Sequence, residues 1–224
     1  GNVCRKAAKE IFTTERKKIA VTDRNIHRFL GKEKYTYQMA NIAAEVGIVR
    51  GLAWTSVGGD TLQIEVNVMP GKGELMLTGQ LGDVMKESAR TGISYIRSVS
   101  KKYAISPDFF EKHDIHVHIP EGAVPKDGPS AGITMAVAML SAITEKKVRA
   151  YLAMTGEVTL RGRVLPIGGL KEKLLAAKSA GIKTVLVPKA NQADVEELSA
   201  EITKGMEILF VESMDELLKA AIGR

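Results

Sequence analysis

The sequence predicts an α+β fold, and two observations carry this prediction. Segments with the period-two alternation of half-buried strands are interleaved with segments that have the periodicity of amphipathic helices. The strand segments come partly as a hairpin and partly between helices, without a repeating strand–helix unit. This order is typical of a mixed sheet and not of a regular doubly wound sheet.

The first 33 residues predict two short basic helices. Residues 2–19 have amphipathic spacing, and Thr22 stands where it would cap a second helix that ends near Gly31. Two such helices bury little apolar surface by themselves, so we expect residues 1–33 to be the end of a preceding domain. A polar, lysine-rich segment leads from them into a second domain, residues 34–224.

From about residue 45 the sequence predicts the strands and helices of a globular domain. Apolar and polar residues alternate from Leu62 to Val68, which predicts a strand. The turn-forming sequence at residues 58–60 joins it to a strand over 47–56, so the two form a hairpin. A strand over 74–78 and a helix over 83–102, capped by Asp83, follow. Further strands are predicted over 114–119, 152–160, 163–167, 184–187 and 207–211, and further helices over 130–144, 169–180, 191–198 and 214–221.

Composition and charge narrow the class of protein. The 224 residues are 45% hydrophobic and 26% charged, which are values of a folded globular chain. No apolar run approaches the roughly 20 residues that span a bilayer, and a signal-peptide pattern is missing. The single cysteine, Cys4, has no partner for a disulfide and no catalytic motif, which fits a reducing, cytoplasmic environment. The net charge of +6 suits weak attraction to DNA or other polyanions, although the basic residues are scattered.

A serine at the start of an apolar helix is the first candidate catalytic residue. A loop rich in glycine and proline leads into residues 133–143, where almost every position is apolar, so this helix must be buried. Pro129 suits the first helical position, which places Ser130 in the first turn among backbone N–H groups without helical partners. Such groups stabilise the oxyanion that forms when a serine attacks a carbonyl. The alternative is that Asp127 and Ser130 only cap the helix.

A lysine on an apolar helix face is the second candidate. In the helix predicted over 169–180, Lys173 falls within the face formed by the leucines and alanines. Its stem would allow the ammonium group to reach water. If the amine stays buried, desolvation lowers its pKa and provides a neutral base. Serine–lysine pairs are an established form of nucleophilic catalysis, so we hypothesise that Ser130 and Lys173 form one.

Histidine is the alternative base. His116 and His118 project from one face of a predicted strand, and a triad of serine, histidine and Asp127 is the competing arrangement. Two such histidines also suit a metal ion, but a third ligand is not evident from the sequence, and we favour packing within the strand. We therefore expect no metal ion or cofactor in this chain.

Two long motifs and one shorter segment resemble the proteolytic domain of the Lon family of ATP-dependent proteases. The first motif is Pro125-Lys126-Asp127-Gly128-Pro129-Ser130-Ala131-Gly132. The second runs through Met154-Thr155-Gly156-Glu157-Val158-Thr159-Leu160-Arg161-Gly162 and on through Val164-Leu165-Pro166-Ile167-Gly168-Gly169-Leu170-Lys171-Glu172-Lys173. The shorter segment is Gly51-Leu52-Ala53-Trp54-Thr55 followed by Gly58-Gly59-Asp60. The resemblance covers residues from about 35 to the end, with the motifs in the order and spacing of the family.

The resemblance implies a serine endopeptidase that hydrolyses peptide bonds of unfolded or damaged proteins. Ser130 is the implied nucleophile, Lys173 the implied general base, and the backbone amides of Ser130 and Ala131 the implied oxyanion donors. Supporting roles are implied for Thr155, which would hold the lysine, and for Asp127, Glu65, His116 and His118. The resemblance also implies a fold shared with small-molecule kinases of the galactokinase–homoserine kinase type, and a hexameric ring.

Lon proteases carry an ATPase module, whereas this sequence has no Gly-x-x-x-x-Gly-Lys-Ser/Thr motif. Residues 1–33 resemble the end of that module's helical lid. We therefore expect ATP and Mg²⁺ to serve the full-length protein in cytoplasmic quality control and the stress response, and not to bind here. Two other classes remain open: phosphoryl transfer, because a glycine-rich loop at a helix start suits a phosphate, and a ring-forming or polyanion-binding module without a reaction.

Overall fold

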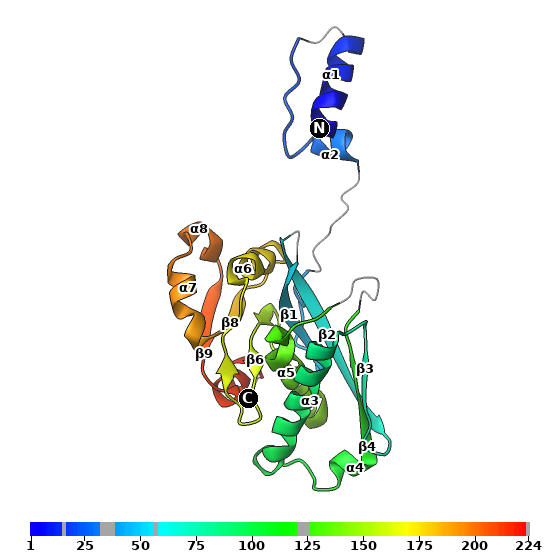
Figure 1. Cartoon of the computed structure of the whole chain (residues 1–224), viewed down its shortest axis with the longest axis vertical. Helices are drawn as coiled ribbons and strands as arrows, with labels where there is room; N and C mark the ends of the chain where they lie inside the picture. Colours follow the sequence, from blue (N-terminus) through cyan, green and yellow to red (C-terminus); the bar gives the residue numbers. More distant parts are fainter. Residues whose placement is uncertain (15–16, 32–38, 56–57, 121–125, 223–224) are drawn as a thin grey trace. The chain divides into compact units, whose positions relative to one another are not determined.

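The computed structural model describes residues 1–14, 17–31, 39–55, 58–120 and 126–222 (Figure 1). The chain forms two compact units, Gly1–Thr36 and Tyr37–Arg224. The domain boundary that the sequence predicts, between residues 33 and 34, lies outside the described residues.

The described residues of the first unit form two helices, α1 (Asn2–Thr14) and α2 (Ile26–Leu30). Helix α1 ends earlier than the sequence predicts, at a threonine whose β-branched side chain disfavours helix and whose hydroxyl donates to the Glu10 carbonyl at 2.6 Å. The prediction that Thr22 caps α2 is wrong. Its carbonyl accepts from the amides of Asn25 and Ile26 in a turn that precedes the helix, whereas Gly31 does end α2, with φ at 85°.

The second unit is built on a mixed sheet, which within the described residues has seven strands in the order β3-β4-β2-β1-β5-β8-β9. The strands are β1 (Ile48–Thr55), β2 (Gly58–Pro70), β3 (Leu75–Thr78), β4 (His113–His118), β5 (Leu152–Met154), β8 (Thr184–Pro188) and β9 (Glu207–Val211). The pairs β1–β2 and β2–β4 are antiparallel, and the other four pairs are parallel. This combination of a hairpin with crossover connections gives the mixed architecture that the interleaved sequence pattern indicates.

The predicted hairpin is confirmed, but its predicted turn is wrong. Strands β1 and β2 pair from Ile48 with Glu65 to Thr55 with Gly58, so residues 58–60 belong to β2. The chain between the paired ends, residues 56–57, lies outside the described residues. Gly59 is needed for another reason, because a Cβ atom there would lie 1.9 Å from the carbonyl oxygen of Glu172.

The helices of the second unit cover both faces of the sheet (Figure 1). They are α3 (Asp83–Ser98), α4 (Phe109–Lys112), α5 (Gly132–Thr144), α6 (Leu170–Ser179), α7 (Gln192–Glu196), α8 (Ala200–Thr203) and α9 (Met214–Ala221), with 3₁₀ turns η1 (Ser100–Tyr103), η2 (Pro129–Ala131) and η3 (Lys189–Asn191). The sequence did not predict the single-turn helices α4 and α8. The single helix that the sequence predicts over 83–102 combines α3 with most of η1, whereas α3 ends at Ser98.

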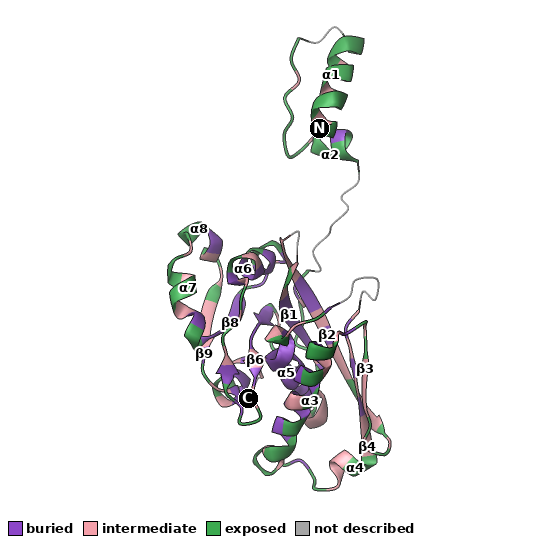
Figure 2. Cartoon of the chain, viewed as in Figure 1, coloured by how far each residue is buried: buried purple, intermediate pink, exposed green. Residues whose placement is uncertain are grey.

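Two hydrophobic cores form because successive strand residues point to opposite faces. Leu152, Met154 and Leu186 pack with residues of α3, α5 and α9. Their neighbours Ala153 and Val185 pack instead with residues of α6 and α8. Figure 2 shows α5 as a largely buried helix, and every residue from Gly132 to Ser141 is buried, which confirms the prediction for this segment.

The strand predicted over 152–160 is interrupted between β5 and the short hairpin of β6 (Glu157–Val158) with β7 (Val164–Leu165). The interruption falls at Thr155 and Gly156. The Gly156 amide donates to the carbonyl of Ser130 at 2.8 Å, and the Ile133 amide donates to the carbonyl of Gly156 at 3.2 Å. The chain therefore leaves the sheet here to hold the start of α5.

Candidate active site

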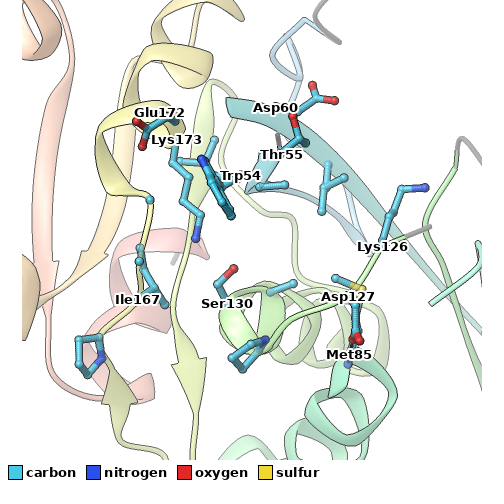
Figure 3. A pocket seen from close by; sticks show the side chains of 18 residues that line it. Trp54, Thr55, Asp60, Met85, Lys126, Asp127, Ser130, Ile167, Glu172 and Lys173 are labelled. Carbon is cyan, nitrogen blue, oxygen red and sulfur yellow. Dashed lines mark hydrogen bonds between the residues drawn. The ribbon is translucent and has the colours of Figure 1, made fainter. Parts of the chain in front are cut away.

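A pocket of about 770 Å³ brings the two unusual side chains of the sequence together (Figure 3). It lies among β1, β2, the start of α3, the turn before α5 and the start of α6. Its wall is largely apolar, with Trp54, Leu62, Met85 and Ile167 among the lining residues. Ser130 and Lys173 both line it, and Figure 3 shows the hydroxyl of the first and the amine of the second pointing toward each other.

Ser130 lies in the 3₁₀ turn η2, which leads directly into α5. The turn follows Gly128, whose φ of 122° favours glycine, and begins with Pro129, as the sequence predicts. The backbone amides of Ser130 and Ala131 occupy the first positions of this helical segment, where the helix itself supplies no carbonyl to accept from them. Both residues line the pocket.

Lys173 is buried in the first turn of α6, with 2% of its surface exposed. The alternative that its amine escapes to water is therefore wrong. Burial removes the hydration that stabilises the charged form, which lowers the pKa of this lysine from 10.5 to about 8. Desolvation is the cause of the shift, so a substantial fraction of the amine is neutral near pH 8.

Thr155 connects the lysine to the serine turn. Its side chain is fully buried, with no exposed surface. The amine of Lys173 donates to its Oγ1 at 3.3 Å, and Oγ1 donates to the main-chain carbonyl of Ser130 at 3.4 Å. A threonine hydroxyl has a single proton, so Thr155 can only accept from the lysine while it donates to Ser130.

Asp127 lines the pocket, but its hydrogen bonds serve the fold. The carboxylate accepts from the Met85 amide at 3.0 Å and from the Gly128 amide at 2.9 Å. It therefore satisfies an amide of the first turn of α3, which corrects the prediction that Asp83 caps this helix. Gly82 is the N-cap residue, and its missing side chain makes room for Asp127, since a Cβ there would lie 2.3 Å from the carboxyl carbon.

Glu65, His116 and His118 do not line the pocket. The two histidines share the hydroxyl of Thr78, at 2.8 Å from His116 Nε2 and 2.7 Å from His118 Nδ1. Glu65 stands opposite His118 in the β2–β4 ladder and accepts from the Gln63 amide group at 2.7 Å. The alternative of a serine–histidine–aspartate triad is therefore wrong, because no histidine is among the described residues that line the pocket.

The histidine pair is also not part of a metal cluster. Within the described ranges, no group of three or more histidine, cysteine, aspartate or glutamate side chains could hold a metal ion. The same ranges contain no helix with the length and apolar character needed to cross a membrane.

Sequence reasoning missed residues that shape the pocket. Trp54 is 63% exposed, and its place in the sequence carries no periodic signal that would mark it as a pocket residue. Asn191, at 3% exposure, accepts from the Ile167 amide at 3.0 Å and donates to the Ile167 carbonyl at 2.9 Å. An asparagine at a predicted helix start resembles an ordinary cap, so its role in fixing the pocket wall shows only in the folded chain.

Comparison with known proteins gives one consistent match. A family model described as the Lon protease (S16) C-terminal proteolytic domain matches residues 20–224. The Lon protease of Lachnoclostridium phytofermentans is 69% identical over 216 residues, which are 96% of this chain and 27% of that protein. The Lon protease of Clostridioides difficile is 55% identical over 223 residues, covering 99% of this chain and 28% of its own. Lon protease 1 of Bacillus subtilis is 55% identical over 220 residues, covering 98% and 28%. The chain thus spans a little over a quarter of the length of these relatives.

Proposed function

Because the chain belongs to the Lon protease (S16) family, as its C-terminal proteolytic domain, we propose that the pocket lined by Ser130 and Lys173 is the site of peptide-bond hydrolysis. Ser130 is the nucleophile and Lys173 the general base. The observation that carries the proposal is the buried amine with lowered pKa, held by Thr155 in the same pocket as a serine at a helix start.

The first half of the reaction forms an acyl-enzyme. Since Thr155 uses its only proton toward Ser130, the lone pair of the neutral Lys173 amine is not engaged by the threonine. That lone pair takes the proton of the Ser130 hydroxyl as the oxygen attacks the scissile carbonyl. The carbonyl π electrons move to its oxygen, and the amides of Ser130 and Ala131 stabilise the resulting oxyanion.

Collapse of the tetrahedral intermediate breaks the C–N bond. The Lys173 ammonium returns its proton to the leaving amine, which departs as the new amino terminus. The neutral lysine then takes a proton from a water molecule that attacks the ester. A second tetrahedral intermediate collapses, Ser130 regains a proton from the ammonium, and the carboxylic acid product leaves.

A peptide boronate tests the site directly, because boron forms a tetrahedral adduct with an activated serine and mimics the oxyanion intermediate. The boronate should carry an apolar side chain next to boron, since the pocket wall is largely apolar. Calorimetric titration should give binding at least 100-fold tighter than that of the same peptide ending in a carboxamide. Equal affinities of the two peptides would contradict an assembled serine site in this chain.

The pH dependence of cleavage tests the lysine as base. Only the unprotonated amine accepts a proton, so kcat/KM for a fluorogenic peptide should rise with pH through a midpoint of about 8, the lowered pKa of Lys173, and then level off. Below this midpoint the rate should fall about tenfold per pH unit. A rate that stays constant from pH 6 to pH 9 would exclude this lysine as the base.

Two other functions were left open by the sequence, phosphoryl transfer and polyanion binding, and neither gains support from the site. Asp127 and Lys126 both line the pocket, so its loop does not present the uniformly positive surface that favours a phosphate. A polyanion-binding module would have no need for a buried amine with a lowered pKa in the same pocket as a serine. Binding to DNA stays a prediction.

For the longer protein, we further propose ATP-dependent degradation of unfolded or damaged proteins in the cytoplasm by a hexameric ring. Relatives that carry the name Lon protease are several times longer than this chain, which leaves room for an ATPase module. ATP and Mg²⁺ would bind in that module, since these 224 residues have no phosphate-binding Gly-x-x-x-x-Gly-Lys-Ser/Thr loop. We also propose that the proteolytic domain shares its fold with small-molecule kinases of the galactokinase–homoserine kinase type.

A further inference from the structure

We propose that Gly59, on the β1–β2 hairpin, is a positioning residue that sets the place of Lys173 in the pocket. This inference rests on the proposed function, because it concerns how the base is aligned. Gly59 itself does not line the pocket. It acts through the first turn of α6, which its main chain contacts.

The contact is unusually close and involves backbone on both sides. A Cβ atom built on Gly59 would lie 1.9 Å from the carbonyl oxygen and 2.4 Å from the carbonyl carbon of Glu172, and 3.1 Å from the Cβ of Ala176. Real Cβ atoms do not approach other atoms so closely. The φ angle of Gly59 lies outside the left-handed region, so glycine is required here by the neighbouring helix and not by backbone conformation.

The hairpin holds α6 at a second point as well. Trp54 pairs with Gly59 across the hairpin. The Cβ and Cγ atoms of the tryptophan lie at the opposite end of the same helical turn, where a Cβ on Gly169 would meet each of them at 3.0 Å. Gly169 is the N-cap residue of α6, and its carbonyl accepts from the Lys173 amide to close the helix's first turn, which contains Glu172. The cross-strand pair of Trp54 and Gly59 thus contacts the first turn of α6 both where the turn begins, at Gly169, and where it ends, at Glu172.

This turn is the one that carries the base. Lys173 follows Glu172 directly, and its amide donates to the carbonyl of Gly169 at 3.1 Å. A shift of the turn would therefore shift the lysine amine, whose bond to Thr155 is already long at 3.3 Å. An added methyl group on Gly59 would push the backbone at Glu172 away by about 1.5 Å to reach an ordinary van der Waals distance.

The test compares Gly59→Ala with Gly58→Ala. The control adds the same methyl group one residue earlier, at a position with φ of 130° and nothing within 4 Å, so it strains the hairpin without touching α6. For Gly59→Ala we expect kcat to fall about 100-fold, the usual cost of a misplacement near 1 Å, with a much smaller change in KM. We also expect the midpoint of the pH–rate profile to rise above the wild-type value of about 8, because a displaced amine regains water.

The pH midpoint separates positioning from stability. Partial unfolding lowers the amount of active protein but leaves the midpoint unchanged, which is the result expected for Gly58→Ala. A wild-type midpoint and kcat in folded Gly59→Ala would overturn the inference while leaving the proposed function intact. If the pH–rate profile of the wild-type protein shows no rise near pH 8, both the positioning role of Gly59 and the proposed function are overturned.

A second variant covers the case in which circular dichroism shows that Gly59→Ala does not fold. Ala176→Val enlarges the same contact from the helix side, where the alanine is 1% exposed and faces Gly59. Overpacking between side chains is destabilising, but it avoids the direct conflict of a new Cβ atom with the Glu172 main chain. A raised pH midpoint in this variant supports the positioning role, and an unchanged midpoint contradicts it.

Discussion

Replacing Lys173 with methionine is expected to reduce kcat/KM for peptide cleavage by about 10³-fold or more, because the variant has no group that can take the proton of Ser130. Methionine keeps a long unbranched stem of similar size, so the apolar contacts of α6 remain. The loss should therefore appear in kcat, since the pocket wall that binds the peptide is unchanged. A fluorogenic peptide assay at pH 8.5, where the wild-type amine is largely neutral, measures the difference.

The same substitution should make the domain more stable at neutral pH. The folded-state pKa of Lys173 is about 8, whereas the unfolded chain keeps a value near 10.5. The unfolded state thus binds the proton more tightly, which favours unfolding at every pH below about 10.5 and has its full effect below the folded-state pKa of about 8. At pH 7 the difference between the two pKa values lowers the free energy of unfolding by roughly 3 kcal/mol, which Lys173→Met should restore.

The stabilisation has a characteristic pH dependence. Between pH 8 and 10.5 the folded lysine is neutral whereas the unfolded chain still takes up a proton, and this uptake becomes less favourable as pH rises, so the advantage of Lys173→Met over wild type should shrink. Urea denaturation at pH 7 and pH 9.5 measures both differences. Lys171→Met is the matched control, because this lysine is exposed on the same helix and should alter neither stability nor rate appreciably. Retention of wild-type cleavage by Lys173→Met would eliminate the proposed base.

The sequence predicted those features of the site that depend on residues near one another in the chain. The place of Lys173 on the apolar face of its helix could be predicted because helical spacing compares residues only three or four positions apart, whereas the burial of its amine shows only in the folded chain. The position of Ser130 at a helix start could be predicted from Pro129 and the apolar run that follows. That both side chains line one pocket follows from the crossover from β5 through α6 to β8, which no local pattern determines.

The features missed at the site and around it depend on contacts between distant segments. Residues 58–60 have the composition of a turn, but Gly59 is a glycine because α6 packs against it. Asp83 has the sequence signature of a cap, but the acceptor comes from Asp127, more than forty residues later. His116 and His118 face the same side of a strand as predicted, but the pocket lies elsewhere. Tertiary contacts decided each of these positions over local preference.

Replacing Ser130 with alanine is expected to reduce kcat/KM by about 10⁴-fold or more, because removal of the nucleophile prevents the acyl-enzyme from forming. Stability should change little. The bonds from the Gly156 amide and the Thr155 hydroxyl both go to the main-chain carbonyl of residue 130, which alanine retains. Thermal denaturation should therefore give a melting temperature close to that of wild type.

The Ser130→Ala variant also distinguishes covalent capture from binding in the pocket. It should lose the boron-dependent part of peptide boronate affinity and keep the weaker affinity for the matching carboxamide, since the apolar wall is untouched. Ser94→Ala is the matched control, because this exposed serine donates only to the Arg90 carbonyl on the outside of α3 and should leave both affinities unchanged. Undiminished boronate binding by Ser130→Ala would mean that another nucleophile acts in the pocket. Loss of cleavage together with loss of the boron-dependent affinity would instead establish the hydroxyl oxygen of Ser130 as the attacking nucleophile.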